Sequence, residues 1–276
     1  MSPEEIAAVR RRAAAGEAPA VAFTAVLAAM GVGEPQSWTE ALRRLARAAD
    51  LGEAAAQGQL TALAGLGDLD GWTMQAPERR RLLASPRVSA AADFLPPEVC
   101  AWLTGRARGR VKPALVFDPA TGGPRRESAR NNGAFEFAFA DLDVVAAAVR
   151  ARIAATVSVP QGALEPIQVL HYAPGQTFER HHDFLDVAVP GYAADIARSG
   201  QRIVTFLVYL NTGYEGGETD FPLVGLKFKG QVGEALMFAN VDPTGAPDRR
   251  TLHAGLPPSA GEKWLLSQWI RDRARV

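Results

Sequence analysis

From Val88 to the end of the chain, short apolar runs alternate with clusters of glycine and proline. Runs of four to eight residues have the length of β-strands. Many short strands with turn-rich connections indicate a β-sandwich or a barrel. Two helices are expected in this region, Pro97–Arg108 and Asp141–Thr156. The expected strands lie in the runs Ala114–Phe117, Ala134–Phe139, Ile167–Tyr172, Ile203–Leu210, Ala235–Phe238 and Trp264–Ile270.

The segment before residue 86 has a different character, rich in alanine, leucine and arginine, and is expected to be helical almost throughout. A shift of 36 positions places Gly16 on Gly52 and Gly31 on Gly67, and apolar residues fall on apolar residues. A fixed period in this range is typical of stacked helical hairpins. The second copy resembles the Sel1-like repeat. A four-helix cap with coincidental spacing is the alternative interpretation.

These two patterns predict two domains: a helical, Sel1-like repeat region over residues 1–85 and a strand-rich domain over residues 86–276. A junction rich in glycine and proline separates them, and a short basic helix is expected there near Glu78–Leu83.

Charge and cysteine content limit the classes of protein. Thirty basic side chains balance thirty acidic ones, so the composition indicates neither a nucleic-acid nor a membrane-surface partner. The single cysteine, Cys100, cannot form an internal disulfide, which suits a reducing cytosol. The N-terminus lacks the apolar core of a signal peptide, and no apolar run approaches the ~20 residues that span a bilayer. We therefore expect a cytoplasmic protein. A contact between its N-terminal helices and another protein is possible.

Three of the four histidines lie in one short stretch of the sequence. His181 and Asp183 follow an expected strand, and a His-x-Asp pair on a strand places both side chains on the same face. His253 lies far downstream and can join them when a barrel closes. Two imidazoles and one carboxylate on one side of a metal form the facial triad of non-haem iron(II) oxygenases. His182 should face the opposite way and is not expected to be a ligand.

By itself a His-x-Asp pair is a weak indication, because most histidines in loops are structural or solvated. Lys263 strengthens it, since it opens the apolar run that ends at Ile270. Lysine is seldom placed inside an apolar strand unless its ammonium group is paired. A basic side chain aimed into a barrel suits the distal carboxylate of 2-oxoglutarate.

From about residue 88 to its end, the chain resembles the prolyl 4-hydroxylase-type family of iron(II)- and 2-oxoglutarate-dependent oxygenases. The matching motifs occur in family order and cover about two-thirds of the chain. They are Tyr172-x-Pro174-Gly175-Gln176, His181-x-Asp183, Gly200-Gln201-Arg202-x-x-Thr205, Tyr209-Leu210-Asn211, Gly216-Gly217-Glu218-Thr219-x-Phe221-Pro222, His253-x-Gly255 and Lys263-Trp264.

The resemblance implies an α+β fold whose catalytic core is a double-stranded β-helix, or jelly-roll barrel, with supporting helices. It implies that His181, Asp183 and His253 are catalytic residues that bind iron(II). It further implies dioxygen as the oxidant, with ascorbate as a candidate reductant.

The resemblance also implies that Lys263 acts in catalysis as the salt-bridge partner of the 2-oxoglutarate distal carboxylate. Tyr172 and Thr205 would assist it in binding the cosubstrate. Tyr172 ends an expected strand that leads to the metal turn, so its hydroxyl can donate into the pocket. For Thr205 an alternative stays open, in which a β-branched residue only fills a strand.

Two long loops, Pro119–Gly133 and Asp186–Gly200, are expected to gate substrate access. Arg126 in the first loop and Glu218 beyond the Gly-Gly pair are candidate substrate contacts. The alternative interpretation is that Arg126, with Arg125 and Arg130 in the same loop, is only a solvated loop residue.

The expected function is hydroxylation of an unactivated C–H bond with release of succinate and carbon dioxide. A prolyl or other residue of a peptide or protein is the expected substrate, and a free amino acid or a natural product is the alternative. A repeat-based binding protein and a zinc hydrolase are also considered. Lys263 and the absence of a glutamate base beside His181 count against a zinc hydrolase.

Overall fold

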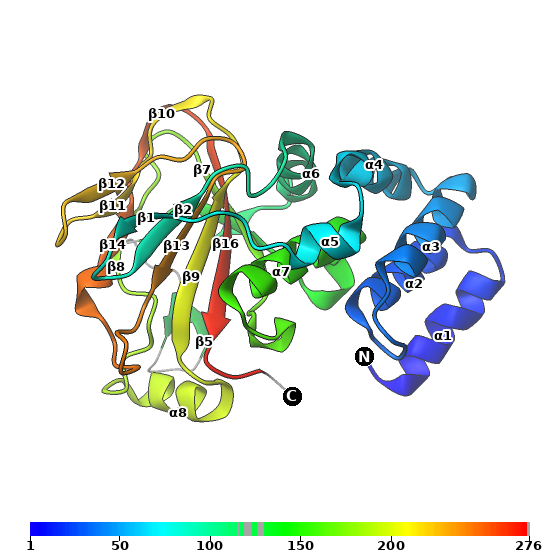
Figure 1. The fold of residues 1–276 in the computed structure, drawn as a ribbon, viewed down its shortest axis with the longest axis horizontal. Coiled ribbons are helices and arrows are strands. Elements are labelled where there is room, and N and C mark those ends of the chain that lie inside the picture. The colour runs from blue at the N-terminus through cyan, green and yellow to red at the C-terminus, as the bar shows by residue number, and fades with distance from the viewer. Residues whose placement is uncertain (115, 119–122, 126–129, 275–276) are drawn as a thin grey trace. The chain divides into compact units, whose positions relative to one another are not determined.

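A computed structural model describes residues 1–114, 116–118, 123–125 and 130–274 (Figure 1). The chain divides into two compact units, each described here by itself. The first unit combines Met1–Ala76 with Ala138–Ser158, and the second combines Pro77–Phe137 with Val159–Val276. Within the described part of the chain, no helix has both the length and the apolar character needed to cross a membrane.

The first unit is helical, and its first four helices follow the 36-residue spacing. Glycine at the ends of equivalent helices adopts positive φ in both copies, with Gly16 at 83° and Gly52 at 91°. This left-handed conformation ends a helix at little steric cost only for glycine. The helices are α1 (Pro3–Ala14), α2 (Ala18–Met30), α3 (Trp38–Asp50), α4 (Ala54–Leu63), the 3-10 turn η1 (Ala64–Leu66), α5 (Leu69–Met74), η2 (Phe139–Asp141) and α7 (Val144–Val157).

Helix α7 packs with α2, α4 and α5, although its sequence lies far from theirs. Buried residues lie all around it, from Val144 to Thr156, so several of its faces need cover. The side chain of Gln59 in α4 accepts a hydrogen bond of 2.8 Å from the first helical N–H of α7, at Val144. The compact units therefore differ from the division expected at residue 85, because α7 joins the N-terminal helices.

The second unit contains an eight-stranded antiparallel sheet in the order β1-β2-β13-β9-β16-β7-β6-β3. Its strands are β1 (Arg80–Leu83), β2 (Val88–Ala91), β3 (Lys112–Pro113), β6 (Gly133–Glu136), β7 (Gln168–Tyr172), β9 (Arg202–Tyr209), β13 (Ala235–Ala239) and β16 (Lys263–Arg271). The helix α6 (Pro97–Ala107) contacts β7.

A smaller four-stranded sheet has the order β12-β11-β14-β8. Buried side chains from both sheets form one apolar cluster that includes Tyr172, Tyr209, Phe221 and Phe238. This arrangement of two antiparallel sheets is consistent with the expected jelly-roll barrel. The remaining elements are β4 (Val116–Asp118), β5 (Gly123–Arg125), η3 (Gln161–Ala163), β8 (Phe178–His181), α8 (Pro190–Ser199), β10 (Tyr214–Gly216), β11 (Thr219–Phe221), β12 (Leu226–Phe228), η4 (Arg249–Thr251), β14 (His253–Gly255) and β15 (Pro258–Gly261).

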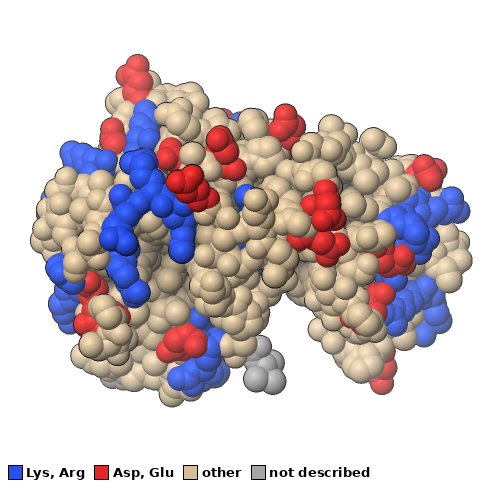
Figure 2. All heavy atoms as spheres, in the orientation of Figure 1, with Lys and Arg blue, Asp and Glu red and all other residues tan. Residues whose placement is uncertain are grey.

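The short basic helix expected near Glu78–Leu83 is wrong, because Arg80–Leu83 form the edge strand β1. Its partner β2 turns Val88 and Ala90 toward the barrel core, and the side chains of Arg80 and Arg81 in β1 are exposed. Figure 2 shows Lys and Arg gathered around a hollow on one face. A hollow over the β1–β2 hairpin is lined by Arg79, Arg81 and Arg87. Charged edge strands oppose pairing with other chains.

The contact between α4 and α7 can be tested with Gln59→Leu. This change leaves the buried Val144 N–H without its acceptor, so we expect a loss of about 1–3 kcal/mol in the free energy of unfolding. Gln57→Leu, at an exposed position of the same helix, is the control and should have little effect. Chemical denaturation measures both. Equal stability of the two variants would contradict the assignment of α7 to the first unit.

Candidate active site

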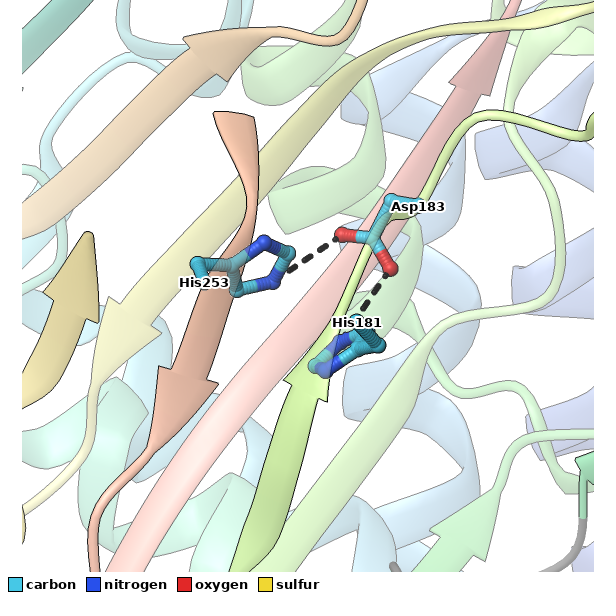
Figure 3. A group of neighbouring side chains, drawn as sticks. All are labelled: His181, Asp183 and His253. Carbon is cyan, nitrogen blue, oxygen red and sulfur yellow. Dashed lines mark ion pairs between the residues drawn. The ribbon is translucent and has the colours of Figure 1, made fainter. Parts of the chain in front are cut away.

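His181, Asp183 and His253 come together between the two strands β8 and β14 (Figure 3). His181 ends β8, His253 begins β14, and the two residues are register partners in the small sheet. Asp183 follows β8 by two positions. The Asp183 carboxylate lies 3.6 Å from His181 Nε2 and 3.5 Å from His253 Nε2. Two ligands that are each about 2.1 Å from one ion lie roughly this far apart, so the three donors fit a single divalent metal.

The second nitrogen of each imidazole is held by a backbone carbonyl. His181 Nδ1 lies 2.7 Å from the Glu179 oxygen, and His253 Nδ1 lies 2.9 Å from the Thr251 oxygen. A carbonyl only accepts, so each Nδ1 must donate and each Nε2 presents its lone pair to the shared point. Burial lowers the pKa of His181 to about 3, which keeps this imidazole neutral and able to bind a metal.

Asp183 is almost fully buried, yet it is held in its charged form. Burial opposes its ionisation, but the hydrogen bond from the Thr205 hydroxyl favours the charged form, and the pKa of Asp183 is lowered. Thr205 Oγ1 donates to Asp183 Oδ2 at 2.7 Å, and Asn240 Nδ2 donates to Thr205 Oγ1 at 3.0 Å. These contacts orient the carboxylate toward the two histidines.

The structure places Thr205 behind Asp183, at the edge of the metal group rather than beside Lys263. Thr205 does not line the pocket that contains Lys263. The register of the large sheet explains the position, since Thr205 pairs with Trp269 while Tyr209 pairs with Leu265 near the Lys263 end of β16. The expected role of Thr205 in cosubstrate binding therefore has no support from its contacts.

Lys263 lies in the same pocket as the three donors and is fully buried. Its Nζ donates to the Gly217 carbonyl at 2.7 Å and lies 5.0 Å from the centre of the Tyr172 ring. A Cβ atom at Gly217 would approach Tyr214 to 2.9 Å, so glycine lets this carbonyl come close to the ammonium group. Burial lowers the pKa of Lys263 to about 7, and burial raises the pKa of Tyr172 to about 12. Tyr172 thus stays protonated and can donate.

Several pocket residues were missed by sequence reasoning. Successive residues of a strand face opposite ways, so Lys263, Leu265, Ser267 and Trp269 share one face of β16. This alternation could have identified them once Lys263 was placed in the pocket. The missed lining residues include Phe178, Leu207, Leu265 and Trp269, whereas Thr219 and Arg130 were already considered as contacts or loop residues.

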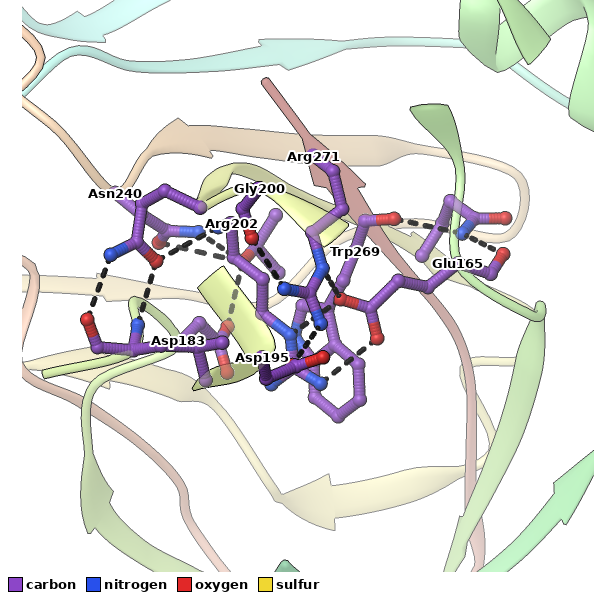
Figure 4. A network of polar contacts seen from close by, with 12 residues as sticks. Glu165, Asp183, Asp195, Gly200, Arg202, Asn240, Trp269 and Arg271 are labelled. Carbon is purple, nitrogen blue, oxygen red and sulfur yellow. Dashed lines mark hydrogen bonds and ion pairs between the residues drawn. The ribbon is translucent and has the colours of Figure 1, made fainter. Parts of the chain in front are cut away.

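A buried ionic network lies next to the pocket and fixes Trp269 (Figure 4). Arg202 donates two hydrogen bonds to the Glu165 carboxylate, at 2.7 and 2.9 Å. Its guanidinium carbon lies 3.7 Å from the centre of the Trp269 ring. Arg271 donates to Asp195 at 2.8 Å, which ties α8 to the last strand. The network therefore determines the position of one wall of the pocket.

The structure does not bring every expected residue to the site. Glu218 is half-buried and does not line the pocket. His182 Nε2 lies 3.0 Å from the Arg249 carbonyl, which agrees with its expected exclusion from the ligand set. Arg126 lies outside the described residues. The loop expected at Asp186–Gly200 contains the helix α8.

Thr205→Val separates two roles for this side chain. The variant removes the hydrogen bond to Asp183 at nearly constant volume, so metal affinity should fall about 10- to 100-fold. The affinity for 2-oxoglutarate at saturating metal should change much less. Thr61→Val, at an exposed position of α4, is the control. Unchanged metal affinity with weakened 2-oxoglutarate binding would restore the role first expected for Thr205.

Comparisons with known proteins agree with this chemistry. Residues 167–271 match the 2OG-Fe(II) oxygenase superfamily. Prolyl 4-hydroxylase 1 of Arabidopsis thaliana is 34% identical over 204 residues, which cover 69% of this chain and 70% of that protein. Prolyl 4-hydroxylase 13 of the same plant is 31% identical over 205 residues, covering 68% and 72%.

A solved structure is similar to the chain as well. The viral collagen prolyl hydroxylase of Paramecium Bursaria Chlorella virus-1, in complex with 2OG, matches with a TM-score of 0.50 and 29% identity. The match covers 67% of this chain and 95% of that one. Membership of this family implies iron(II), 2-oxoglutarate and dioxygen as the reagents, and a His-Asp-His group that could bind the iron is present here. The chain belongs to the 2OG-Fe(II) oxygenase superfamily and is a 2-oxoglutarate-dependent dioxygenase.

Proposed function

We propose that the protein hydroxylates a prolyl residue of a peptide or protein. The observation that carries this proposal is the buried His181, Asp183 and His253 group in one pocket with Lys263. These three donors would hold iron(II), which would supply the chemistry for hydroxylation of a C–H bond by dioxygen and 2-oxoglutarate, with release of succinate and carbon dioxide. The substrate class comes from the prolyl 4-hydroxylase relatives.

The pocket residues have separate tasks. His181, Asp183 and His253 would hold the metal, and the pocket that they line would receive the cosubstrate and the substrate. Lys263 receives the distal carboxylate of 2-oxoglutarate, and the Tyr172 hydroxyl donates to the cosubstrate. Leu207 and Leu265 line the pocket and exclude water. Presence of the Asp183 carboxylate also distinguishes the site from that of a halogenase, which needs this ligand position for halide.

Further parts of the proposal concern the rest of the chain and its surroundings. We infer that the 36-residue helical hairpins are Sel1-like repeats, because equivalent glycines take the same backbone conformation. Such arrays commonly bind protein partners, which favours a protein or peptide substrate. Ascorbate is the proposed reductant and the cytoplasm the proposed compartment. An ascorbate requirement in turnover and the fractionation of the native protein test these two statements.

The proposed reaction is tested with proline-containing peptides, free amino acids and a cell extract. Product should gain the mass of one oxygen atom, together with succinate, and a metal chelator should abolish both. His181→Ala should abolish turnover through lost metal, because it removes one of three donors. His182→Ala, which changes the neighbouring imidazole, should retain turnover. Oxygen incorporation into a free amino acid but into no peptide would overturn the proposed substrate.

The Lys263 contact predicts a pH dependence. The pKa of Lys263 in the unliganded pocket is about 7, so the ammonium group is present below that pH and is lost above it. A carboxylate ligand needs the charged form, so 2-oxoglutarate affinity should be highest below pH 7. Above pH 7 it should fall by up to about tenfold per pH unit, until the pKa of the liganded lysine is reached.

Lys263→Arg supplies the control, because arginine stays protonated throughout this range. Its 2-oxoglutarate affinity should be weaker or equal at pH 6 and nearly constant to pH 9. Titration of the anaerobic iron(II) protein with 2-oxoglutarate measures both profiles. A flat wild-type profile would contradict the assigned contact.

A further inference from the structure

A hollow of about 450 Å³ lies over the hairpin of β1 and β2 and shares no lining residue with the pocket of the metal group. Volumes of this size are typical of sites for small ligands. In Figure 2, Lys and Arg side chains gather around a hollow where Figure 1 draws these two strands. The β1–β2 hollow combines three arginines with a serine and a few apolar side chains, namely Arg79, Arg81, Leu83, Ala84, Arg87, Val88 and Ser89.

The register of the hairpin brings the basic side chains to one face. Arg81 pairs with Ser89 across the two antiparallel strands, and such partners point to the same side of a sheet. Arg79 and Arg87 lie two positions before Arg81 and Ser89, just ahead of each strand, and line the same hollow. Ala90, the next residue along β2, points into the barrel core instead. Three guanidinium groups therefore meet at one hollow, with the Ser89 hydroxyl among them.

These three arginines have no acidic partner. None of them forms an ion pair within the described part of the chain, and no described acidic side chain lines the hollow. Arg80, which alternates with Arg81 along β1, does pair, because its guanidinium group lies 3.6 Å from the Glu234 carboxylate. Like charges that share one hollow repel each other. Their arrangement costs free energy that a bound anion would recover.

Protection of the sheet edge explains only part of this cluster. Charged side chains on an edge strand oppose pairing with other chains, which accounts for Arg81 in β1. It does not account for Arg87, which precedes β2, the inner strand of the hairpin. Arg87 Nη2 donates to the Val241 carbonyl at 3.4 Å. This contact orients the guanidinium group and leaves most of its five N–H donors available to a ligand.

A phosphate group suits three guanidinium groups better than a carboxylate does. A phosphate monoester carries a charge of about −1.5 to −2 at pH 7 and three acceptor oxygens. A carboxylate carries one charge and two oxygens, which a single guanidinium fork already satisfies. The Ser89 hydroxyl is half-buried, has no hydrogen-bond partner among the residues that the structure describes, and can donate to the same anion. Arginine clusters recognise phosphoryl groups in many proteins.

We propose that the β1–β2 hollow binds a small phosphate-bearing ligand. The guanidinium groups of Arg79, Arg81 and Arg87 surround the phosphate, and the Ser89 hydroxyl donates to it. Apolar side chains of the lining, such as Leu83, contact the rest of an organic phosphate. Free phosphate and an organic phosphate share this chemistry, and the test distinguishes them. The proposal does not depend on the substrate of the active site.

The test measures binding of adenosine monophosphate, adenosine and inorganic phosphate to the full-length protein by calorimetry. The protein is loaded with manganese(II), which does not support turnover, and saturated with 2-oxoglutarate, so that the active-site pocket is occupied. A salt concentration of about 0.15 M screens weak surface attraction. Wild type should bind adenosine monophosphate and not adenosine. Equal affinity for inorganic phosphate identifies free phosphate as the ligand, whereas tighter binding of adenosine monophosphate identifies an organic phosphate.

Substitutions on the two sides of β1 separate a built site from attraction by net charge. Arg81→Gln should weaken binding of the phosphate ligand about tenfold, because charge-assisted hydrogen bonds are lost. Arg81→Lys keeps the charge but loses the planar fork, so it should recover only part of this affinity. Arg80→Gln is the matched control, since it removes the same charge from the next position of β1, outside the hollow. It should bind the ligand nearly as wild type does.

Three outcomes would overturn the proposal. Equal losses in Arg80→Gln and Arg81→Gln would mean that net charge alone attracts the anion. Equal affinity for adenosine and adenosine monophosphate would mean that the phosphate is not recognised. Affinity for a single-stranded oligonucleotide that rises with its length would indicate a nucleic-acid surface in place of a small-ligand site. Arg80 and Arg81 are exposed, so their variants should unfold at the same temperature as wild type, and folding does not obscure the comparison.

Discussion

Burial of the Asp183 carboxylate is the constraint on which the rest of the site depends. A charged group in a dry barrel is strongly unfavourable without compensation. The Thr205 hydroxyl donates to it from one side, whereas the two imidazoles on the other side face it with nitrogen lone pairs. Because each histidine is fixed by a backbone carbonyl, the carboxylate and both Nε2 atoms converge (Figure 3). A divalent metal completes this balance of charge.

Compensation of a buried carboxylate by nearby polar or charged groups also organises the surroundings of the metal group. Glu165 is another buried carboxylate, and Arg202 and Arg271 lower its pKa against the effect of burial. Their contacts join α8, β9 and β16 and place Trp269 in the pocket wall (Figure 4). Buried ion pairs of this kind contribute position more than net stability, because desolvation offsets most of their attraction. We infer that the network keeps the wall in place while ligands enter and leave.

The two buried cations of the pocket approach from different sheets. Lys263 belongs to β16 in the large sheet, and Arg130 pairs with β8 at the edge of the small one. The metal donors lie on β8 and β14, in the small sheet and the turn that follows β8. The two cations thus share one pocket in a barrel whose core remains apolar. Specificity in such a site depends on strand edges and loops more than on the core.

Local patterns in the sequence determined which chemistry the chain can hold. The spacing of His181 and Asp183, the position of Lys263 in an apolar run and the duplicated glycines are readable because each follows from the geometry of a single strand or helix end. Tertiary structure alone decided that Thr205 lies behind Asp183, that Arg130 enters the pocket, that α7 joins the N-terminal helices and that Arg80–Leu83 form a strand. Each of these depends on which distant segments become neighbours and in what register. These pairings depend on how much apolar surface the whole barrel and the helical unit bury, and no short stretch of sequence determines that amount.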